Sequence, residues 1–187
     1  MISVILIFMN QEKIMKIEKN EYGEFYERYI KLSNNVPLED QLLSNAEEMK
    51  DLFLGLSDEY AMYRYQEGKW TLKQIFSHII DTERIFNYRA LCLARGEPKP
   101  LPGYDQDLYM EDTNFNEQSL DQLQDQYDAT RQATIALFSN FTEEELLKRG
   151  TISDFSFTVR ATGYVIAGHE LHHLNIINEK YLPGIGE

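Results

Sequence analysis

The spacing of apolar residues constrains the fold of this chain more than any other feature of its sequence. Through most of the chain, apolar side chains recur at intervals of three and four residues. Strict alternation of apolar and polar residues is nearly absent outside the first residues. The first spacing gathers side chains on one face of an α-helix, whereas alternation is typical of half-buried strands. We therefore predict an all-α protein.

Capping residues and helix breakers divide this pattern into separate helices. Thr71 with Gln74, and Ser119 with Gln122, have the spacing of capping boxes, in which each side chain bonds the other residue's backbone N–H. Glycine and proline stop the chain from continuing as a helix after these segments. The predicted long helices span residues 37–55, 71–95, 119–138 and 158–181.

Shorter predicted segments lie between the long helices. Short helices are predicted at residues 21–32, 58–62 and 142–148, a long loop at 96–116, and a loop-like or briefly extended segment at 150–157. Four amphipathic helices bury their apolar faces most economically against one another, because no sheet is available to cover them. We predict a four-helix bundle with an additional short helix at its N-terminal side.

Composition limits the number of domains and the kinds of partner. A chain of 187 residues with 43% hydrophobic content is long enough for one domain with a sizeable core. The formal net charge of -13 opposes extended contact with nucleic acid or an anionic membrane, so neither is predicted as a partner. Cys92 is the single cysteine and cannot form an internal disulfide, which favours a reducing, cytoplasmic location.

The first residues do not resemble a membrane anchor. The apolar stretch at residues 1–9 is far too short to cross a bilayer and lacks a basic leader. A polar helical pattern begins at Met15. We therefore predict that residues 1–14 form an extension outside the fold and that residues 15–187 form a single domain; ordered packing of Ile5 and Phe8 against the core would contradict this.

Three of the four histidines lie close together near the end of the last predicted helix. His169 and His173 are four residues apart, so both can direct a ring nitrogen at one point, whereas His172 points well off that axis. A third ligand must come from another helix, and His78 lies on an apolar face there. One histidine on such a face is more often a hydrogen-bonded core residue, but the combination favours one divalent metal ion held by His78, His169 and His173.

The same segment also contains the pattern H-E-x-x-H, in which Glu170 takes the position of the general base of a zinc peptidase. Zinc peptidases with this motif take a third ligand downstream, but only 14 residues follow His173 and Ile176 replaces the expected glycine. The peptidase interpretation is therefore disfavoured. Glu170 remains a candidate proton acceptor.

A family resemblance rests on several blocks of sequence. These blocks are residues 63–65 (YRY), 68–71 (GKWT), 78–96, 101–105 (LPGYD) and 167–174 (AGHELHHL). Over residues 36–182 the chain resembles the DinB-like superfamily, which includes bacillithiol-transferase-like proteins, in its second-type DinB branch. This resemblance implies a DinB-like four-helix bundle that binds zinc or nickel through His78, His169 and His173. It also implies a low-molecular-weight thiol as cosubstrate and is compatible with a homodimer.

Three functions follow as hypotheses. The first is a metal-dependent enzyme that acts on a small molecule, such as an S-transferase using a low-molecular-weight thiol activated by the metal. The second is a metal-dependent hydrolase in which a bound water is the nucleophile and Glu170 its base. The third is a non-catalytic protein that binds a metal or a ligand.

Further predictions concern residues on the second long helix and just before it. Asp81 is a candidate partner for the second nitrogen of a ligand histidine. Arginines of the second long helix are expected to pair with local acids, although one of them could receive a substrate carboxylate. Aromatic residues before that helix are expected to pack rather than to line a pocket. These residues are Arg84, Arg89, Arg95, Tyr63, Tyr65 and Trp70.

Overall fold

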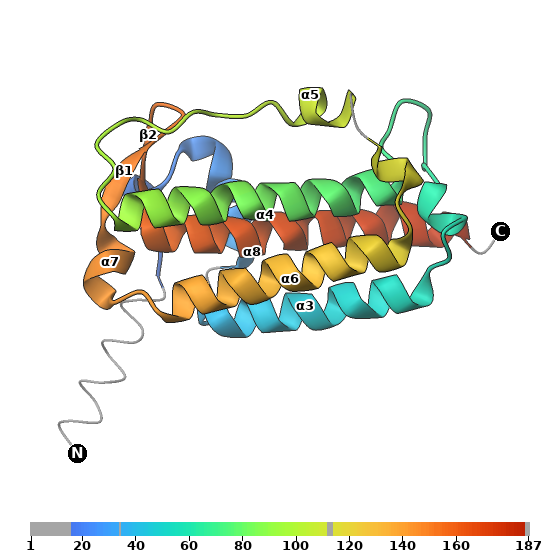
Figure 1. The fold of residues 1–187 in the computed structure, drawn as a ribbon, viewed down its shortest axis with the longest axis horizontal. Coiled ribbons are helices and arrows are strands. Elements are labelled where there is room, and N and C mark those ends of the chain that lie inside the picture. The colour runs from blue at the N-terminus through green and yellow to red at the C-terminus, as the bar shows by residue number, and fades with distance from the viewer. Residues whose placement is uncertain (1–15, 34, 112–113, 186–187) are drawn as a thin grey trace, which may run out of the picture.

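Four long helices lie side by side in the computed structural model, which describes residues 16–33, 35–111 and 114–185 (Figure 1). They are α3 (Leu38–Gly55), α4 (Leu72–Ala94), α6 (Leu120–Ser139) and α8 (Val159–Ile176). Their positions match the four predicted long helices, and the predicted bundle is confirmed. The predicted extension at residues 1–14 lies outside the described residues.

The order of the helices in the bundle differs from their order in the sequence. Both α4 and α3 have α6 and α8 as neighbours. The colour ramp of Figure 1 shows that α3 and α8 run in one direction while α4 and α6 run in the other. Because α4 and α6 are parallel, the segment that joins them must return along the length of the bundle. We call this segment, residues 95–119, the crossover.

Most of the shorter helical elements lie at the ends of the bundle or in the crossover, whereas the last one on the N-terminal side packs along α8. Those on the N-terminal side are two single turns, Lys19–Glu21 and Glu24–Tyr26, followed by α2 (Glu27–Ser33), in place of the one helix predicted. The turn Tyr60–Met62 and helix α7 (Glu143–Leu147) match predicted segments. Helix α8 continues into a π-helical turn, Ile177–Tyr181, and a last turn, Leu182–Ile185.

The crossover is not the plain loop that the sequence predicts, because it contains α5 (Gln106–Glu111) and the turn Phe115–Glu117. Asp105 starts α5: its Oδ1 accepts the backbone N–H groups of Asp107 and Leu108 at 3.0 and 3.2 Å. Such a side-chain cap satisfies amides that have no partner within the helix. The sequence does not predict α5, because its 6 residues are too few to show an apolar period.

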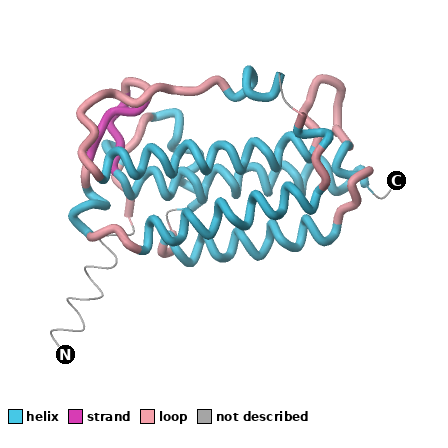
Figure 2. The backbone as a smooth tube through the Cα atoms, viewed as in Figure 1, coloured by secondary structure: helices cyan, strands magenta, loops and turns pink. Residues whose placement is uncertain are grey.

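A short antiparallel hairpin replaces the segment that was expected to be loop-like or briefly extended (Figure 2). Strands β1 (Arg149–Ile152) and β2 (Phe155–Thr158) pair through a turn at Ser153 and Asp154, whose φ angles of 48° and 69° are both positive. Two positive φ angles are typical of the turn that best matches strand twist. Leu101 of the crossover bonds to Thr151 and Ser153, so the hairpin holds one end of the crossover.

The bundle core consists of two apolar clusters separated by a layer of polar side chains. One cluster gathers near the hairpin and α2, around residues such as Phe86 and Val165, and the other lies toward the opposite end, around Met49 and Phe76. Between them, α3, α4, α6 and α8 each contribute buried polar residues. We call these residues the polar layer: Asn45, Thr82, Glu83, Thr130, Arg131, Thr134, His169 and Glu170.

The contact between α2 and α8 depends on Gly168. A Cβ atom at this position would lie 2.0 Å from the backbone oxygen of Tyr29. We expect Gly168→Ala to lower the free energy of unfolding by ~1–3 kcal/mol or more, because α2 must move, and this cost exceeds the ~1 kcal/mol that alanine gains over glycine within a helix. Gly55→Ala, with no atom within 4 Å of the added Cβ, is the matched control and should leave stability unchanged or raised in urea unfolding. Equal stabilities of the two variants would contradict this close approach.

A buried ion pair fastens the N-terminal segment to α8. Glu21 accepts hydrogen bonds from Arg160 at 2.6 and 2.7 Å and from the hydroxyl of Thr158 at 2.8 Å. Burial alone would raise the pKa of Glu21, but these bonds, with one from the N–H of Glu18, hold the pKa below its usual value of 4.5. The ionised carboxylate therefore stabilises the fold above that value, and this contribution is lost as the pH falls through the lowered pKa.

We expect Glu21→Gln to lower the free energy of unfolding by about 1.5–3 kcal/mol at neutral pH, the usual range for hydrogen bonds to a charged group. The difference from the wild type should shrink as the pH falls below 4.5. Urea unfolding across this pH range checks both statements. Glu27→Gln, which removes exposed pairs to Lys19 and Lys31, should change little. If the difference in the free energy of unfolding between Glu21→Gln and the wild type does not depend on pH, Glu21 contributes through packing and not through its charge.

Candidate metal centre

Three histidine side chains from two helices meet at one point. Nε2 of His169 lies 3.0 Å from Nε2 of His78 and 3.1 Å from Nε2 of His173. Nitrogen atoms of all three rings lie within 4.8 Å of one another. His78 comes from the first part of α4 and the other two from one face of α8, as the sequence predicts. His172 lies beside the ring of His173 but is outside this group.

Hydrogen bonding among the three rings cannot satisfy all three nitrogens. A neutral imidazole nitrogen carries either one hydrogen or one lone pair, so Nε2 of His169 can make only one good bond to its two neighbours. Burial lowers the pKa of His78 to about 4 and lowers those of His169 and His173 well below their usual value. The rings are therefore neutral at physiological pH. Three converging lone pairs suit one divalent cation.

Aromatic rings pack against two of the three histidines. The ring centroid of Tyr29, from α2, lies 5.2 Å from that of His169, and the centroid of Trp70 lies 4.9 Å from that of His78. Tyr63 and Tyr65 instead pack against Tyr181 at the end of the bundle. Both tyrosines therefore pack as expected. Trp70 also packs, but directly against a candidate ligand.

A cavity of about 540 Å³ lies beside the histidines. Its walls come from α2, α4, the crossover, the hairpin turn and α8. The residues that matter most here are Tyr29, Thr82, Phe86, Tyr104, Val165 and His169. His169 therefore both belongs to the histidine group and lines the cavity, so the cavity adjoins one of the candidate ligands. The volume lies within the range of ~300–1,000 Å³ that is usual for small-molecule sites.

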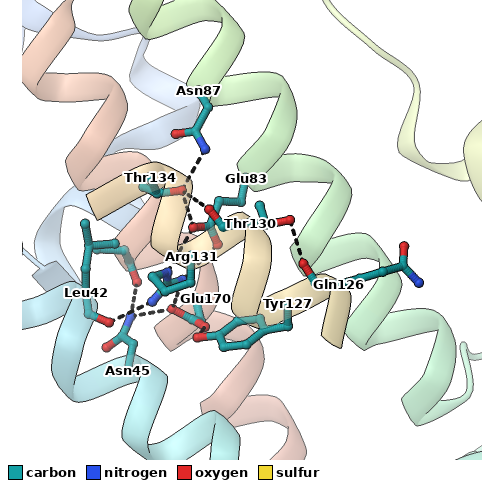
Figure 3. A network of polar contacts seen from close by, with 11 residues as sticks. Leu42, Asn45, Glu83, Asn87, Gln126, Tyr127, Thr130, Arg131, Thr134 and Glu170 are labelled. Carbon is teal, nitrogen blue, oxygen red and sulfur yellow. Dashed lines mark hydrogen bonds and ion pairs between the residues drawn. The ribbon is translucent and has the colours of Figure 1, made fainter. Parts of the chain in front are cut away.

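Glu170 points into the polar layer and not toward solvent (Figure 3). Its Oε1 accepts the hydroxyl of Tyr127 at 2.6 Å, and its Oε2 accepts Arg131 at 2.6 Å and Asn45 at 2.9 Å. Arg131 also donates two hydrogen bonds of 2.9 Å to Glu83. Burial raises the pKa of Glu170, and the charge of Glu83 adds to this effect. Both oxygens of the predicted proton acceptor therefore already have partners.

Comparison with known proteins identifies the family. Residues 41–177 match the model of the DinB superfamily, and this match covers most of the chain. The protein belongs to the DinB superfamily. The predicted family is thereby confirmed.

Individual relatives agree with this assignment. A protein of Oceanobacillus iheyensis, named as a proposed metal-dependent hydrolase, is 30% identical in an alignment 131 residues long that covers 64% of this chain and 69% of that protein. YfiT from Bacillus subtilis, described as a probable metal-dependent hydrolase with an unusual four-helix bundle topology, has a TM-score of 0.63 at 16% identity, covering 88% of this chain and 90% of YfiT. The DinB-like protein YjoA from Bacillus subtilis has a TM-score of 0.58 at 19% identity, covering 80% of this chain and 92% of YjoA.

The remaining predicted residues of this DinB-superfamily protein lie in several places. Asp81 pairs with Arg84 at 3.3 Å and, within the described chain, forms no hydrogen bond with a candidate ligand histidine. Arg95 pairs with Glu145, as expected for a surface arginine. Arg89 departs from this expectation, because among the described residues it forms no ion pair, and it donates to the backbone oxygen of Pro102 at 2.8 Å. In the part of the chain that the structure describes, no helix is long and apolar enough to cross a membrane.

Sequence reasoning did not identify the cavity residues. Tyr29, Thr82 and Tyr104 come from three separate segments, and none of them stands in a spacing typical of a site. Thr82 and Tyr104 lie in the blocks at residues 78–96 and 101–105 on which the resemblance partly rests, and no other signal was available for them. A cavity wall depends on how the crossover and α2 lie over α4, which the apolar period does not specify.

Proposed function

We propose that this DinB-superfamily protein is a divalent-metal-dependent enzyme that acts on a small molecule in the cavity beside His169. One observation carries the proposal: Nε2 atoms of His78, His169 and His173 converge, and His169 also lines the cavity. The names of the Oceanobacillus iheyensis relative and of YfiT support metal-dependent chemistry in the family.

The chain's own groups define the roles at the site. His78, His169 and His173 would hold the ion as neutral ligands, which leaves coordination positions open. Zinc or nickel held there would act as a Lewis acid that lowers the pKa of a water or thiol bound to it. Nitrogen ligands suit either metal.

Tyr104 is placed to orient a substrate. Its hydroxyl lies 2.6 Å from that of Thr82, and burial raises its pKa to about 12, so the group stays protonated. If Thr82 donates within this pair, the hydroxyl hydrogen of Tyr104 is free to bond to a substrate oxygen.

The position of Glu170 favours a thiol over water as the nucleophile. We assign Glu170 to the polar layer, because Arg131, Tyr127 and Asn45 occupy its carboxylate. Hydrolysis with Glu170 as the base would require this network to break. A free thiol has a pKa near 8.5, against 15.7 for water, so a bound thiol loses its proton with less help. We therefore propose transfer of a low-molecular-weight thiol to an electrophile, with hydrolysis, which the relatives' names favour, as the second candidate.

Paired assays test this proposal. Protein purified without a histidine tag and loaded with zinc or nickel is incubated with alkyl halide electrophiles and cysteine, and separately with an ester panel without thiol. We expect metal-dependent consumption of thiol that His169→Ala abolishes. Ester turnover that needs no thiol would contradict thiol transfer and support hydrolysis. Stoichiometric metal with no turnover in either assay would indicate a non-catalytic binding protein.

A further inference from the structure

Aromatic side chains make up a large part of the cavity wall beside His169. Five phenylalanine and tyrosine residues line the cavity: Phe25, Tyr26, Tyr29, Phe86 and Tyr104. The proposed function uses only the hydroxyl of Tyr104 among them. Six-membered aromatic rings thus form a larger share of this wall than any other class of side chain.

Four of these rings already pack against one another, mostly edge to face. The ring centroid of Tyr26 lies 5.2 Å from that of Phe25 and 5.7 Å from that of Phe86, with interplanar angles of 83° and 73°. Tyr29 extends the group, because its ring lies 6.2 Å from that of Phe25 and 5.2 Å from that of His169. Rings attract one another in this arrangement, since the positive edge of one meets the negative face of the next. The aromatic wall therefore begins directly beside a candidate metal ligand.

The wall keeps aromatic surface that the core does not cover. Phe25 is 59% exposed, and Tyr26 and Tyr104 are half-buried. A ligand that covers this surface removes apolar area from water, and an aromatic ligand makes ring–ring contacts in addition. A saturated ligand of the same size gains the first contribution without the second. The wall thus favours an aromatic ring over an aliphatic group of similar size.

The charges around the cavity do not select a charged ligand. Asp105 is the one acid among the described residues that line it, and none of these residues is a lysine or an arginine. Outside the lining, the guanidinium of Arg28 lies 4.0 Å from the ring centroid of Phe25 and 4.7 Å from that of Tyr29. An anion would approach the acid and a cation would approach the guanidinium, so each would meet a like charge. A neutral ligand meets neither penalty.

We propose that the cavity binds neutral small molecules through an aromatic ring that packs against Phe25 and Tyr29. The inference rests on the proposed function, because it names the substrate class of the same site. Phe25 and Tyr29 are thus specificity residues, apart from the three histidines.

The test compares benzyl alcohol with cyclohexylmethanol, which differ only in whether the six-membered ring is aromatic, by ligand-observed NMR titration. In the wild type we expect benzyl alcohol to bind about 2–10-fold more tightly, since ring–ring contacts are worth ~0.5–1.5 kcal/mol beyond the area that they bury. Phe25→Leu should reduce this preference and Phe25→Tyr should keep it. Tyr88→Leu is the matched control and should leave the preference unchanged, because Tyr88 is 61% exposed but is not among the described residues that line the cavity.

Three outcomes would overturn the inference. The first is equal binding of the two probes, or tighter binding of cyclohexylmethanol, in the wild type. The second is an unchanged preference in Phe25→Leu, which would remove the assigned contact. The third is tighter binding of benzoate, or of benzylamine as its cation, than of benzyl alcohol, which would contradict the choice of a neutral ligand.

A measurement on the wild type covers the case in which a variant does not fold. In protein with ¹³C-labelled phenylalanine and tyrosine, intermolecular NOEs should connect the ring protons of benzyl alcohol to those of the protein. Absence of these NOEs at saturating benzyl alcohol would refute the aromatic contact.

Separate outcomes distinguish this inference from the proposed function. His173 is a candidate metal ligand but is not among the described residues that line the cavity, so His173→Ala should keep the preference for benzyl alcohol. The preference in wild-type protein that binds no metal would uphold the aromatic site and count against the metal centre. Stoichiometric metal with equal binding of the two probes would uphold the metal centre and overturn the aromatic site.

Discussion

His173→Ala should reduce the affinity of the protein for zinc or nickel by more than about 100-fold. Even residues that only orient a ligand change metal affinity by about 10–100-fold, so loss of a ligand should have the larger effect. Nε2 of His173 lies 3.1 Å from that of His169, and no other histidine or acid of the described chain joins this group of three. Elemental analysis and metal titration of protein purified without a histidine tag measure the change.

His172→Ala is the matched control for this prediction. The two histidines are adjacent on α8, but the ring of His172 lies against Tyr29 and outside the converging nitrogens. Metal content should therefore stay stoichiometric in His172→Ala. If both variants bind metal as the wild type does, the three histidines are a packing arrangement and the enzymatic proposal loses its basis.

Arg131→Met should be the most destabilising of the substitutions considered. Arg131 is the cation that faces both Glu83 and Glu170, whose side chains are 2% and 1% exposed. Burial alone would lower the pKa of Arg131, but the two glutamates raise it well above its usual value, so the group stays charged. Removing one partner of a buried pair costs ~3–5 kcal/mol, a large part of the ~5–15 kcal/mol that stabilises a typical domain.

Chemical unfolding measures this effect, with Arg95→Met as the control. Arg95 pairs with Glu145 at the surface, where such pairs contribute ~0–1 kcal/mol. Adding Glu83→Gln and Glu170→Gln to Arg131→Met should restore part of the stability, because no buried charge then remains without a partner. If the free energy of unfolding of Arg131→Met lies within ~1 kcal/mol of the wild-type value, the two glutamates are neutral in the absence of the arginine.

Local patterns in the sequence predict the long helices and the pair of His169 and His173, because both depend on residues close together in the chain. The capping boxes at Thr71 and Ser119 form as their spacing indicates. The pair His169 and His173 shares a face for the same local reason. His78 can join this pair only if α4 lies next to α8. The apolar face of α4 on which His78 lies was sufficient to predict this contact.

Features that depend on the order of the helices could not be predicted in this way. Glu83, Arg131 and Glu170 lie on three different helices, and their spacing in the sequence does not indicate that they are partners. The motif H-E-x-x-H therefore suggested a proton acceptor at Glu170, although residue 170 is rotated by a quarter turn or more from His169 and faces the interior. The hairpin and α5 are too short for a period to show, and the cavity depends on the path of the crossover.

The polar layer also restricts how the helices can slide past one another. A shift of α6 along α4 and α8 by one helical turn, ~5.4 Å, would carry Arg131 out of reach of both glutamates and set their charges against apolar side chains. Leu and Ile contacts alone tolerate such a slip far better, since one aliphatic surface resembles another. Misregistered packings of this bundle therefore carry an electrostatic penalty, and the same alignment keeps His78 level with the two histidines of α8.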